Sequence, residues 1–268
     1  MSRQLVRTAD GQPMVIDRVP GPHDAPAVVL LHGWTCRRGY WSAQLAHLEN
    51  RYPLLAPDLP GHGHTAAPDR SSWTLEGLVA DVLQMLRDTR TEDAVLVGHS
   101  MGGAVALEVA AWLGAQVRGI VLVDTFLIDY GGLDAEARKS LYVPFRADMR
   151  AALANMVNTR LGPDAPAELR RQLAVELPET PRQVALPLWK SLLAWQPLET
   201  LTTLRCRIHA INGAFIPESA RARVAPYMTE EIMSHAGHFP QMEDPEGFNT
   251  RLDAALSRLQ APSALECP

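Results

Sequence analysis

The sequence predicts an α/β fold in which helices cover both faces of a mostly parallel sheet. From residue 27 onward, strand-like and helical runs alternate, as in chains whose parallel strands are joined by helices. The run 120–123 is apolar at every position, which is typical of a central parallel strand. With 268 residues, 47% of them hydrophobic, the chain can bury a large core, and this length favours one domain with an insertion.

The first half of the chain supplies the alternating elements in order. Residues 3–18 are expected to form an edge hairpin. The helix after Trp73 takes Thr74 as its N-cap, with Glu76 in its first turn, and its apolar residues recur at helical spacing. The predicted strands of this half are 27–31, 54–57 and 94–98, and the predicted helices are 41–48, 75–86 and 101–113.

Between residues 124 and 207 the pattern changes, because amphipathic helical segments occur there without a convincing strand. These segments lie near 134–142, 145–159, 166–175 and 181–195. We predict that 127–202 is a helical cap inserted after the sixth strand, and that 1–126 and 203–268 form the core. The remaining core elements are strands at 208–211 and 229–233 and helices at 216–225 and 245–259, followed by a frayed tail at 261–268.

Ser100 occupies the centre of the segment Gly98-His99-Ser100-Met101-Gly102, between a predicted strand and a predicted helix. This layout is typical of a nucleophile elbow, a sharp turn that requires small residues two positions before and after the serine. Gly98 and Gly102 meet this requirement. The following helix directs its N-terminal N–H groups toward an oxyanion that forms near Ser100. The alternative is an ordinary turn with an exposed hydroxyl, and the flanking elements favour the elbow.

Three further segments accompany this motif in a fixed order. Residues 32–34 (His-Gly-Trp) follow one predicted strand, residues 58–64 (Asp-Leu-Pro-Gly-His-Gly-His) follow the next, and residues 237–239 (Gly-His-Phe) lie near the C-terminus. At these positions and at 98–102, the sequence resembles the alpha/beta-hydrolase superfamily, in particular its serine esterase and lactonase-type members. The resemblance covers nearly the whole chain. It implies the alpha/beta-hydrolase fold, with a mostly parallel eight-stranded sheet, helices on both faces and a helical cap.

The resemblance also implies the roles of four residues. A serine hydroxyl is a poor nucleophile at neutral pH and needs a neighbouring imidazole to take its proton, and His238 stands where such chains present this base. The oxyanion formed by attack of Ser100 would be bound by two backbone N–H groups, those of Trp34 and Met101. Asp58, in its glycine-rich turn, is expected to support neighbouring loops instead of taking part in catalysis.

The acidic partner of His238 departs from the commonest family pattern, which places an Asp shortly after the strand at 208–211. Here residues 214–216 are Ala-Phe-Ile, and none of them can orient an imidazole. Some family members hold the acid at the end of the preceding strand, where this chain has Asp124. We expect Asp124 to hold His238 in its base tautomer, with Glu218 as the alternative acid. A structural explanation of Asp124 is that it caps the following turn.

The predicted cap carries more large apolar side chains than a linker needs. These residues could line an acyl or aromatic pocket, or they could only pack the cap onto the core. The candidate pocket residues, including two from the core, are Trp34, Tyr142, Phe145, Met149, Trp189 and Phe239.

Charge and composition exclude several classes of partner. A net charge of −5 without a basic cluster argues against binding to nucleic acid or an anionic membrane, and a small-molecule substrate fits better. The first residues have no apolar signal core and no stretch approaches about 20 apolar residues, which predicts a cytoplasmic protein. Cys36, Cys206 and Cys267 are widely spaced, so we expect reduced thiols and no metal site. The oligomeric state is left open.

The function expected from these features is a cofactor-independent serine hydrolase that cleaves a small ester, thioester or lactone through an acyl-enzyme. The acid placement and residues 33–34 also resemble cofactor-free quinolone dioxygenases. In that chemistry, His238 and Asp124 would deprotonate a hydroxylated N-heteroaromatic, and Ser100 would only hydrogen-bond it. A third possibility is a non-enzymatic small-ligand receptor that retains the pocket.

Overall fold

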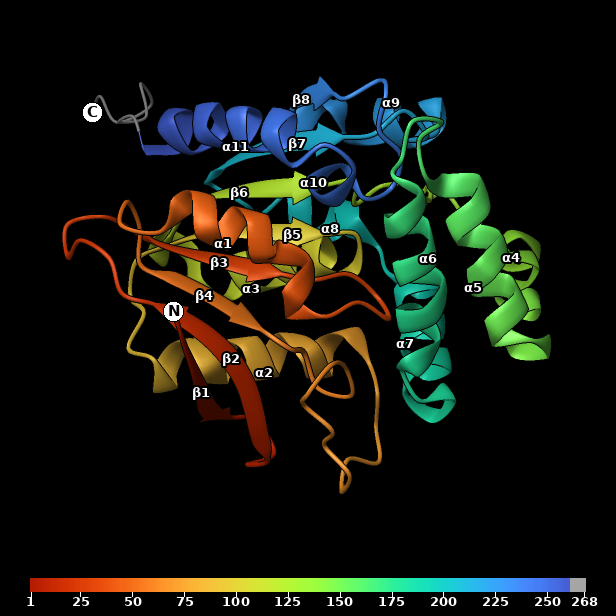
Figure 1. Ribbon diagram of the computed structural model, residues 1–268, viewed down its shortest axis with the longest axis horizontal. Helices are drawn as coiled ribbons and strands as arrows, with labels where there is room; N and C mark the ends of the chain where they lie inside the picture. The colour runs from red at the N-terminus through yellow and green to blue at the C-terminus, as the bar shows by residue number, and fades with distance from the viewer. Residues whose placement is uncertain (261–268) are drawn as a thin grey trace.

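One eight-stranded sheet forms the centre of the protein in the computed structural model, which describes residues 1–260 (Figure 1). Its strand order is β1-β2-β4-β3-β5-β6-β7-β8. The β1/β2 and β2/β4 pairs are antiparallel, and the other neighbours are parallel, which confirms the predicted sheet. The strands are β1 (Ser2–Arg7), β2 (Pro13–Val19), β3 (Ala27–Leu31), β4 (Leu54–Pro57), β5 (Ala94–His99), β6 (Val117–Val123), β7 (Arg207–Asn212) and β8 (Thr229–Ile232).

Hydrophobic side chains fill both faces of this sheet. In β3, Val28 and Leu30 pack into one apolar cluster, and Val29 and Leu31 pack into the other. Successive side chains of a strand point to opposite faces, so an uninterrupted apolar run is buried on both sides. Helices α1 and α11 cover the first face, and α2 and α3 cover the second. The helices of the core are α1 (Ser42–Leu48), α2 (Leu75–Asp88), α3 (Met101–Leu113), α9 (Glu218–Val224), α10 (Pro240–Glu243) and α11 (Pro245–Gln260).

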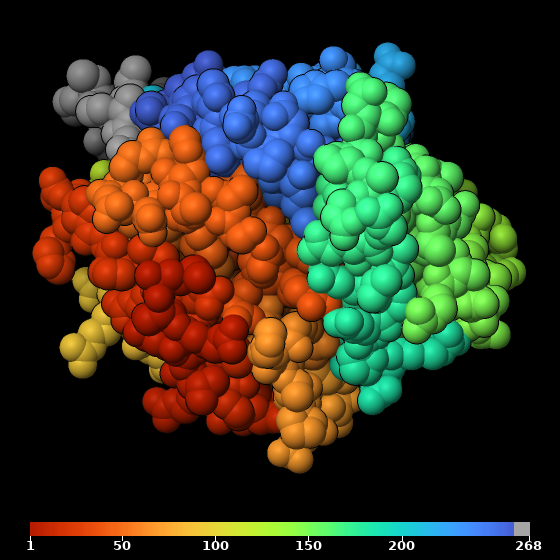
Figure 2. Space-filling view, in the orientation of Figure 1, coloured from red at the N-terminus to blue at the C-terminus, as the bar shows by residue number. Residues whose placement is uncertain are grey.

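A helical insertion lies between β6 and β7 and covers one end of the molecule, on the right in Figures 1 and 2. Buried side chains such as Leu153, Leu173 and Leu188 extend the apolar cluster of the α2 and α3 face into this insertion. The insertion therefore packs on the core and is not a separate body. Its helices are α4 (Ala135–Ala147), α5 (Met149–Arg160), α6 (Ala167–Glu176), α7 (Arg182–Ala194) and α8 (Pro197–Leu201).

The structure differs from the expected elements in two places. The break expected between 142 and 145 lies at Asp148, because α4 continues through Pro144 and the Asp148 carboxylate caps α5 by accepting a hydrogen bond from Ala151 N at 3.0 Å. The short helices α8 and α10 were not expected. The expected edge hairpin is present: β1 and β2 pair antiparallel at one edge of the sheet, and β2 joins the hairpin to β4. The tail at 261–268, with Cys267, lies outside the described residues.

Candidate active site

Ser100 stands at the junction of β5 and α3 in a strained backbone conformation. Its φ is 52° and its ψ is −118°, and its N–H donates to Val123 O at 2.9 Å. The turn is tight because backbones meet without side chains between them: a Cβ on Gly98 would lie 2.3 Å from Gly102 O. Glycine at these two positions therefore allows the turn that presents Ser100, as the elbow requires.

His238 and Asp124 form a buried hydrogen-bonded pair. The His238 Nδ1 atom lies 2.6 Å from Asp124 Oδ2, and the other carboxylate oxygen accepts from Gly213 N at 2.8 Å. The Asp124 side chain is fully buried and that of His238 is nearly so. A carboxylate is only an acceptor when ionised, so the imidazole proton lies on Nδ1 and Nε2 is left with its lone pair. This is the tautomer that a general base needs.

The two acids weighed from the sequence lie in different places. Asp124 follows β6, has a φ of 47°, and donates its N–H to Ile211 O of the neighbouring strand β7. Glu218 is exposed at the start of α9 and lines a separate pocket with Asn212 and Ile216. Because the carboxyl ends of parallel β6 and β7 lie at the same sheet edge, an acid after β6 reaches the same space as one after β7.

Ser100 and His238 line the same cavity, which has a volume of about 230 Å³. Within residues 1–260, the Ser100 hydroxyl makes no hydrogen bond. Contacts of this kind are often long without substrate and tighten when substrate binds. The backbone N–H groups of Trp34 and Met101 also lack an acceptor among the described residues, so both are available to an incoming oxygen.

Aromatic side chains make up much of the cavity wall. Trp34 stacks on Trp189 with ring centroids 4.8 Å apart, and Phe145 meets the edge of Trp34 at 5.1 Å. Trp34 Nε1 donates to Ala185 O at 2.8 Å, which ties this wall to α7. Phe239 also lines the cavity.

Other lining residues were not identified from the sequence. The α5 residues among them recur at helical spacing, a pattern that could have indicated one shared face but not what it faces. Two expected residues, Tyr142 and Met149, lie outside the lining, because α4 turns the neighbouring Leu141 toward the cavity and Met149 is buried at the start of α5. The additional lining residues include Leu127, Ile128, Tyr130, Asn155, Thr159 and Arg160.

Three other buried histidines hold backbone groups. His32 Nδ1 contacts Gly33 O at 2.8 Å, and its Nε2 accepts from Leu59 N at 2.9 Å. His99 Nε2 lies 2.7 Å from His238 O. Burial lowers the pKa of His32, His62 and His99, and the nearby His238 lowers that of His99 further. All three are therefore neutral near pH 7, as expected of groups that position backbone.

His62 makes the stability of the fold depend on pH. Burial lowers its pKa from 6.5 to about 3, so unfolding takes up a proton between these pH values. The stabilising contribution is present above pH 6.5 and is lost as the pH falls toward 3. As the pH falls from 5.5 to 4, we expect the unfolding free energy of His62→Gln to decrease less steeply than that of wild type. The two slopes should differ by about 1.4 kcal/mol per pH unit. Denaturant unfolding at several pH values measures these slopes. The control His23→Gln, at an exposed position, should have the slope of wild type. Equal slopes in wild type and both variants would contradict the prediction.

The contacts of Asp58 and Cys36 indicate structural roles for both residues. The buried Asp58 carboxylate accepts from Arg38 N and His64 N, both at 2.8 Å, and forms an ion pair with the Arg38 guanidinium, so it supports two loops as expected. Cys36 borders the cavity, but its thiol donates to Trp34 O at 3.4 Å and burial raises its pKa, which keeps it protonated.

Within residues 1–260, no cluster of acidic, histidine or cysteine side chains is arranged to hold a metal ion. In the same residues, no helix has the length and apolar character to cross a bilayer.

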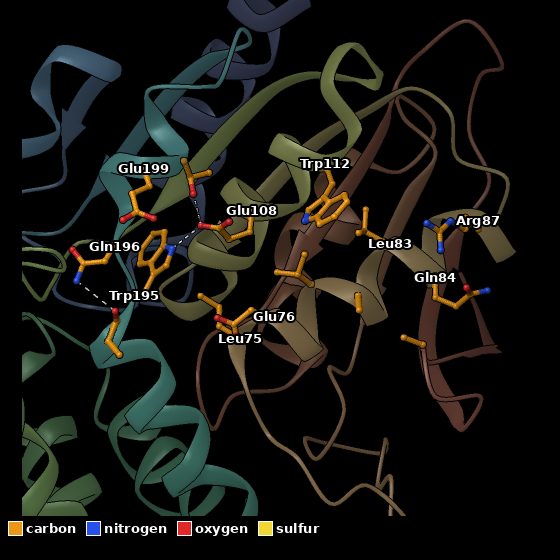
Figure 3. Close-up of a pocket in the computed structure, with 15 residues that line it drawn as sticks. Leu75, Glu76, Leu83, Gln84, Arg87, Glu108, Trp112, Trp195, Gln196 and Glu199 are labelled. Carbon is orange, nitrogen blue, oxygen red and sulfur yellow. Dashed lines mark hydrogen bonds between the residues drawn. The ribbon is translucent and has the colours of Figure 1, made fainter.

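A larger groove, of about 650 Å³, lies between α2, α3 and the α7–α8 segment (Figure 3). Glu108 of α3 accepts there from Trp195 Nε1 at 2.7 Å and from Thr200 Oγ1 at 2.5 Å. These bonds fasten the end of the insertion to the core. The groove is lined by none of the candidate catalytic residues, so the chemistry is expected in the smaller cavity beside Ser100.

Comparison with known proteins places this geometry in a family. The sequence profile of the Alpha/beta hydrolase family matches residues 28–251. Over 104 residues the chain is 38% identical to Lipase LipV of Mycobacterium tuberculosis, an alignment that covers 39% of each protein. Over 113 residues it is 32% identical to the Magnesium-chelatase 30 kDa subunit of Rhodobacter capsulatus, covering 42% of this chain and 39% of that protein.

A solved structure extends the similarity to the whole fold. The esterase RhEst1 from Rhodococcus sp. superposes with a TM-score of 0.76 at 25% identity, over 97% of this chain and 100% of that one. The alignments with the lipase and the chelatase subunit span about two fifths of those proteins, whereas the family profile spans most of this chain. From its profile match and its fold, this chain belongs to the alpha/beta hydrolase family.

Proposed function

We propose that the protein is a cofactor-independent serine hydrolase that cleaves a small carboxylic ester, thioester or lactone through an acyl-enzyme. The observation that carries the proposal is the His238–Asp124 hydrogen bond of 2.6 Å beside a cavity that Ser100 also lines. The esterase and lipase names among similar proteins agree with this class of substrate. Labelling by a fluorophosphonate probe that is lost in Ser100→Ala tests the proposal.

The proposed mechanism uses each group once in acylation and again in deacylation. Ser100 Oγ attacks the substrate carbonyl carbon while His238 Nε2 takes the hydroxyl proton, and Asp124 stabilises the imidazolium that forms. The N–H groups of Trp34 and Met101 bind the oxyanion. His238 then gives the proton to the leaving group, the C–O or C–S bond breaks, and a water activated by His238 releases the acid.

The cavity favours a compact acyl or aromatic group. Its volume of about 230 Å³ is below the range of about 300–1,000 Å³ typical of pockets for drug-sized ligands. Its walls are largely aromatic and aliphatic, and the insertion at 127–202 supplies many of them. We therefore propose that this insertion acts as a cap that sets substrate size.

We expect kcat/KM to be at least about tenfold higher for p-nitrophenyl butyrate than for p-nitrophenyl laurate, because a cavity of about 230 Å³ has little room for the added methylenes. Initial rates over a range of concentrations measure this ratio. Phe145→Ala should reduce the ratio by opening the aromatic wall, whereas Trp112→Ala, at a residue 76% exposed outside this cavity, should leave it unchanged. A wild-type preference for laurate would refute the size argument.

A second candidate is a cofactor-free dioxygenase acting on a hydroxylated N-heteroaromatic. The position of Asp124 after β6, not after β7, is the observation that favours it. His238 would then remove a proton from the substrate, and the carbanion would react with molecular oxygen. Oxygen uptake with a hydroxyquinolone that survives Ser100→Ala but not His238→Ala would favour this candidate over the hydrolase.

A further inference from the structure

Glu243, the last residue of α10, lies beside the loop that carries His238. Its Oε1 accepts from Gly237 N and Phe239 N, both at 3.0 Å, and its Oε2 accepts from Gly162 N at 2.7 Å. Gly237 and Phe239 flank His238 in the chain, whereas Gly162 follows α5 in the insertion. One carboxylate therefore joins the loop of the candidate base to the insertion.

The main chain of His238 is held between the same two parts of the protein. Its N–H donates to Arg160 O, at the end of α5, at 2.6 Å. Its carbonyl oxygen accepts from His99 Nε2 of β5 at 2.7 Å. With the side chain bonded to Asp124, the position of this imidazole depends on the core and on the insertion together.

The end of α5 packs against this loop with no side chain between the two backbones. A Cβ on Gly237 would lie 2.1 Å from Arg160 O, and a Cβ on Gly162 would lie 2.3 Å from His235 O. Neither contact leaves room for any residue but glycine. A small displacement of the end of α5 would therefore move the loop directly.

We propose that Glu243 is a positioning residue that locks His238 to the insertion, so that the catalytic geometry depends on where the insertion sits. The assignment rests on the proposed serine-hydrolase function. A carboxylate suits this role because it offers only acceptors to three donors, and bonds from N–H groups to an ionised acceptor are stronger than neutral ones. In Glu243→Gln, the amide NH₂ would face at least one of these backbone N–H groups.

The test compares E243Q with E246Q, which removes the same charge from an exposed residue three positions along the chain. We expect E243Q to slow fluorophosphonate labelling of Ser100 and to lower kcat by about 10-fold to 100-fold, since a misplacement near 1 Å can cost this much. KM should change by less than about twofold, because Glu243 does not line the cavity. E246Q should behave as wild type.

The link to the insertion has its own variant. Gly162→Ala should slow labelling to a similar degree, whereas Gly39→Ala should not, because a Cβ on Gly39 meets nothing within 4 Å. E243Q that stays folded and labels within about twofold of wild type overturns the proposal. If E243Q does not fold, Glu243→Asp decides in the same assay: the shorter carboxylate should slow labelling at least tenfold, and a wild-type rate overturns the proposal.

A measurement without turnover separates this proposal from the proposed function. The Nδ1 proton that His238 shares with Asp124 should give a low-field ¹H NMR resonance in wild type. A purely structural role for Glu243 would lower the melting temperature and leave this resonance in place, which overturns the proposal. A resonance lost or shifted in folded E243Q supports positioning, even if wild type fails to label and the hydrolase proposal falls.

Discussion

Ser100→Ala is expected to lower kcat for ester hydrolysis by about 10⁴-fold or more and to abolish labelling by a fluorophosphonate. Alanine removes Ser100 Oγ, the atom proposed to form the acyl bond, while the backbone turn and the N–H groups of Trp34 and Met101 remain. The residual rate would come from binding and oxyanion stabilisation alone. Steady-state kinetics and mass spectrometry of the labelled protein measure the two effects.

Ser140→Ala is the matched control, because Ser140 lines the same cavity on α4. It should retain labelling and most of the activity. Hydrolysis that persists in folded Ser100→Ala would remove this serine from the nucleophile's role. Wild-type protein that is folded but neither labels nor hydrolyses esters would instead favour the small-ligand receptor or the dioxygenase.

Asp124→Asn should lower kcat by about 10⁴-fold while leaving KM nearly unchanged. The Asn oxygen can still accept from Gly213 N, which places the amide NH₂ against His238 Nδ1. That nitrogen must then accept, so the imidazole proton moves to Nε2 and the ring cannot take the proton of Ser100. Initial-rate kinetics, with circular dichroism as the test of folding, measure the effect.

Glu218→Gln tests the other acid that the sequence allowed. Because Glu218 is exposed beside a different pocket, this variant should retain wild-type kcat. A large loss in E218Q together with an active D124N would reverse the assignment. Equal and small losses in both would indicate that His238 works without a carboxylate partner.

Much of the fold could be predicted because its elements carry local patterns. The periodicity over 75–86 and the Thr74 cap matched α2, whose Thr74 side chain accepts from Gly77 N at 3.2 Å. The break between α4 and α5 lies a few residues later than expected, because α4 continues through Pro144 and ends where Asp148 caps α5. The cavity lining was predicted only in part, because an amphipathic pattern indicates that a helix has an apolar face, whereas packing decides which residues of that face border the cavity.

By itself, the sequence determined the α/β alternation and the elbow around Ser100, because these follow from the spacing of hydrophobic residues and from local backbone geometry. It also limited the acid to two candidates, Asp124 and Glu218. Only the tertiary structure decided that Asp124 meets His238, since this depends on the parallel alignment of β6 and β7. It alone also brought Glu243 to residues 160–162, which no spacing along the chain encodes. Contacts between distant segments are set by how the elements pack, and packing is decided by the whole core at once.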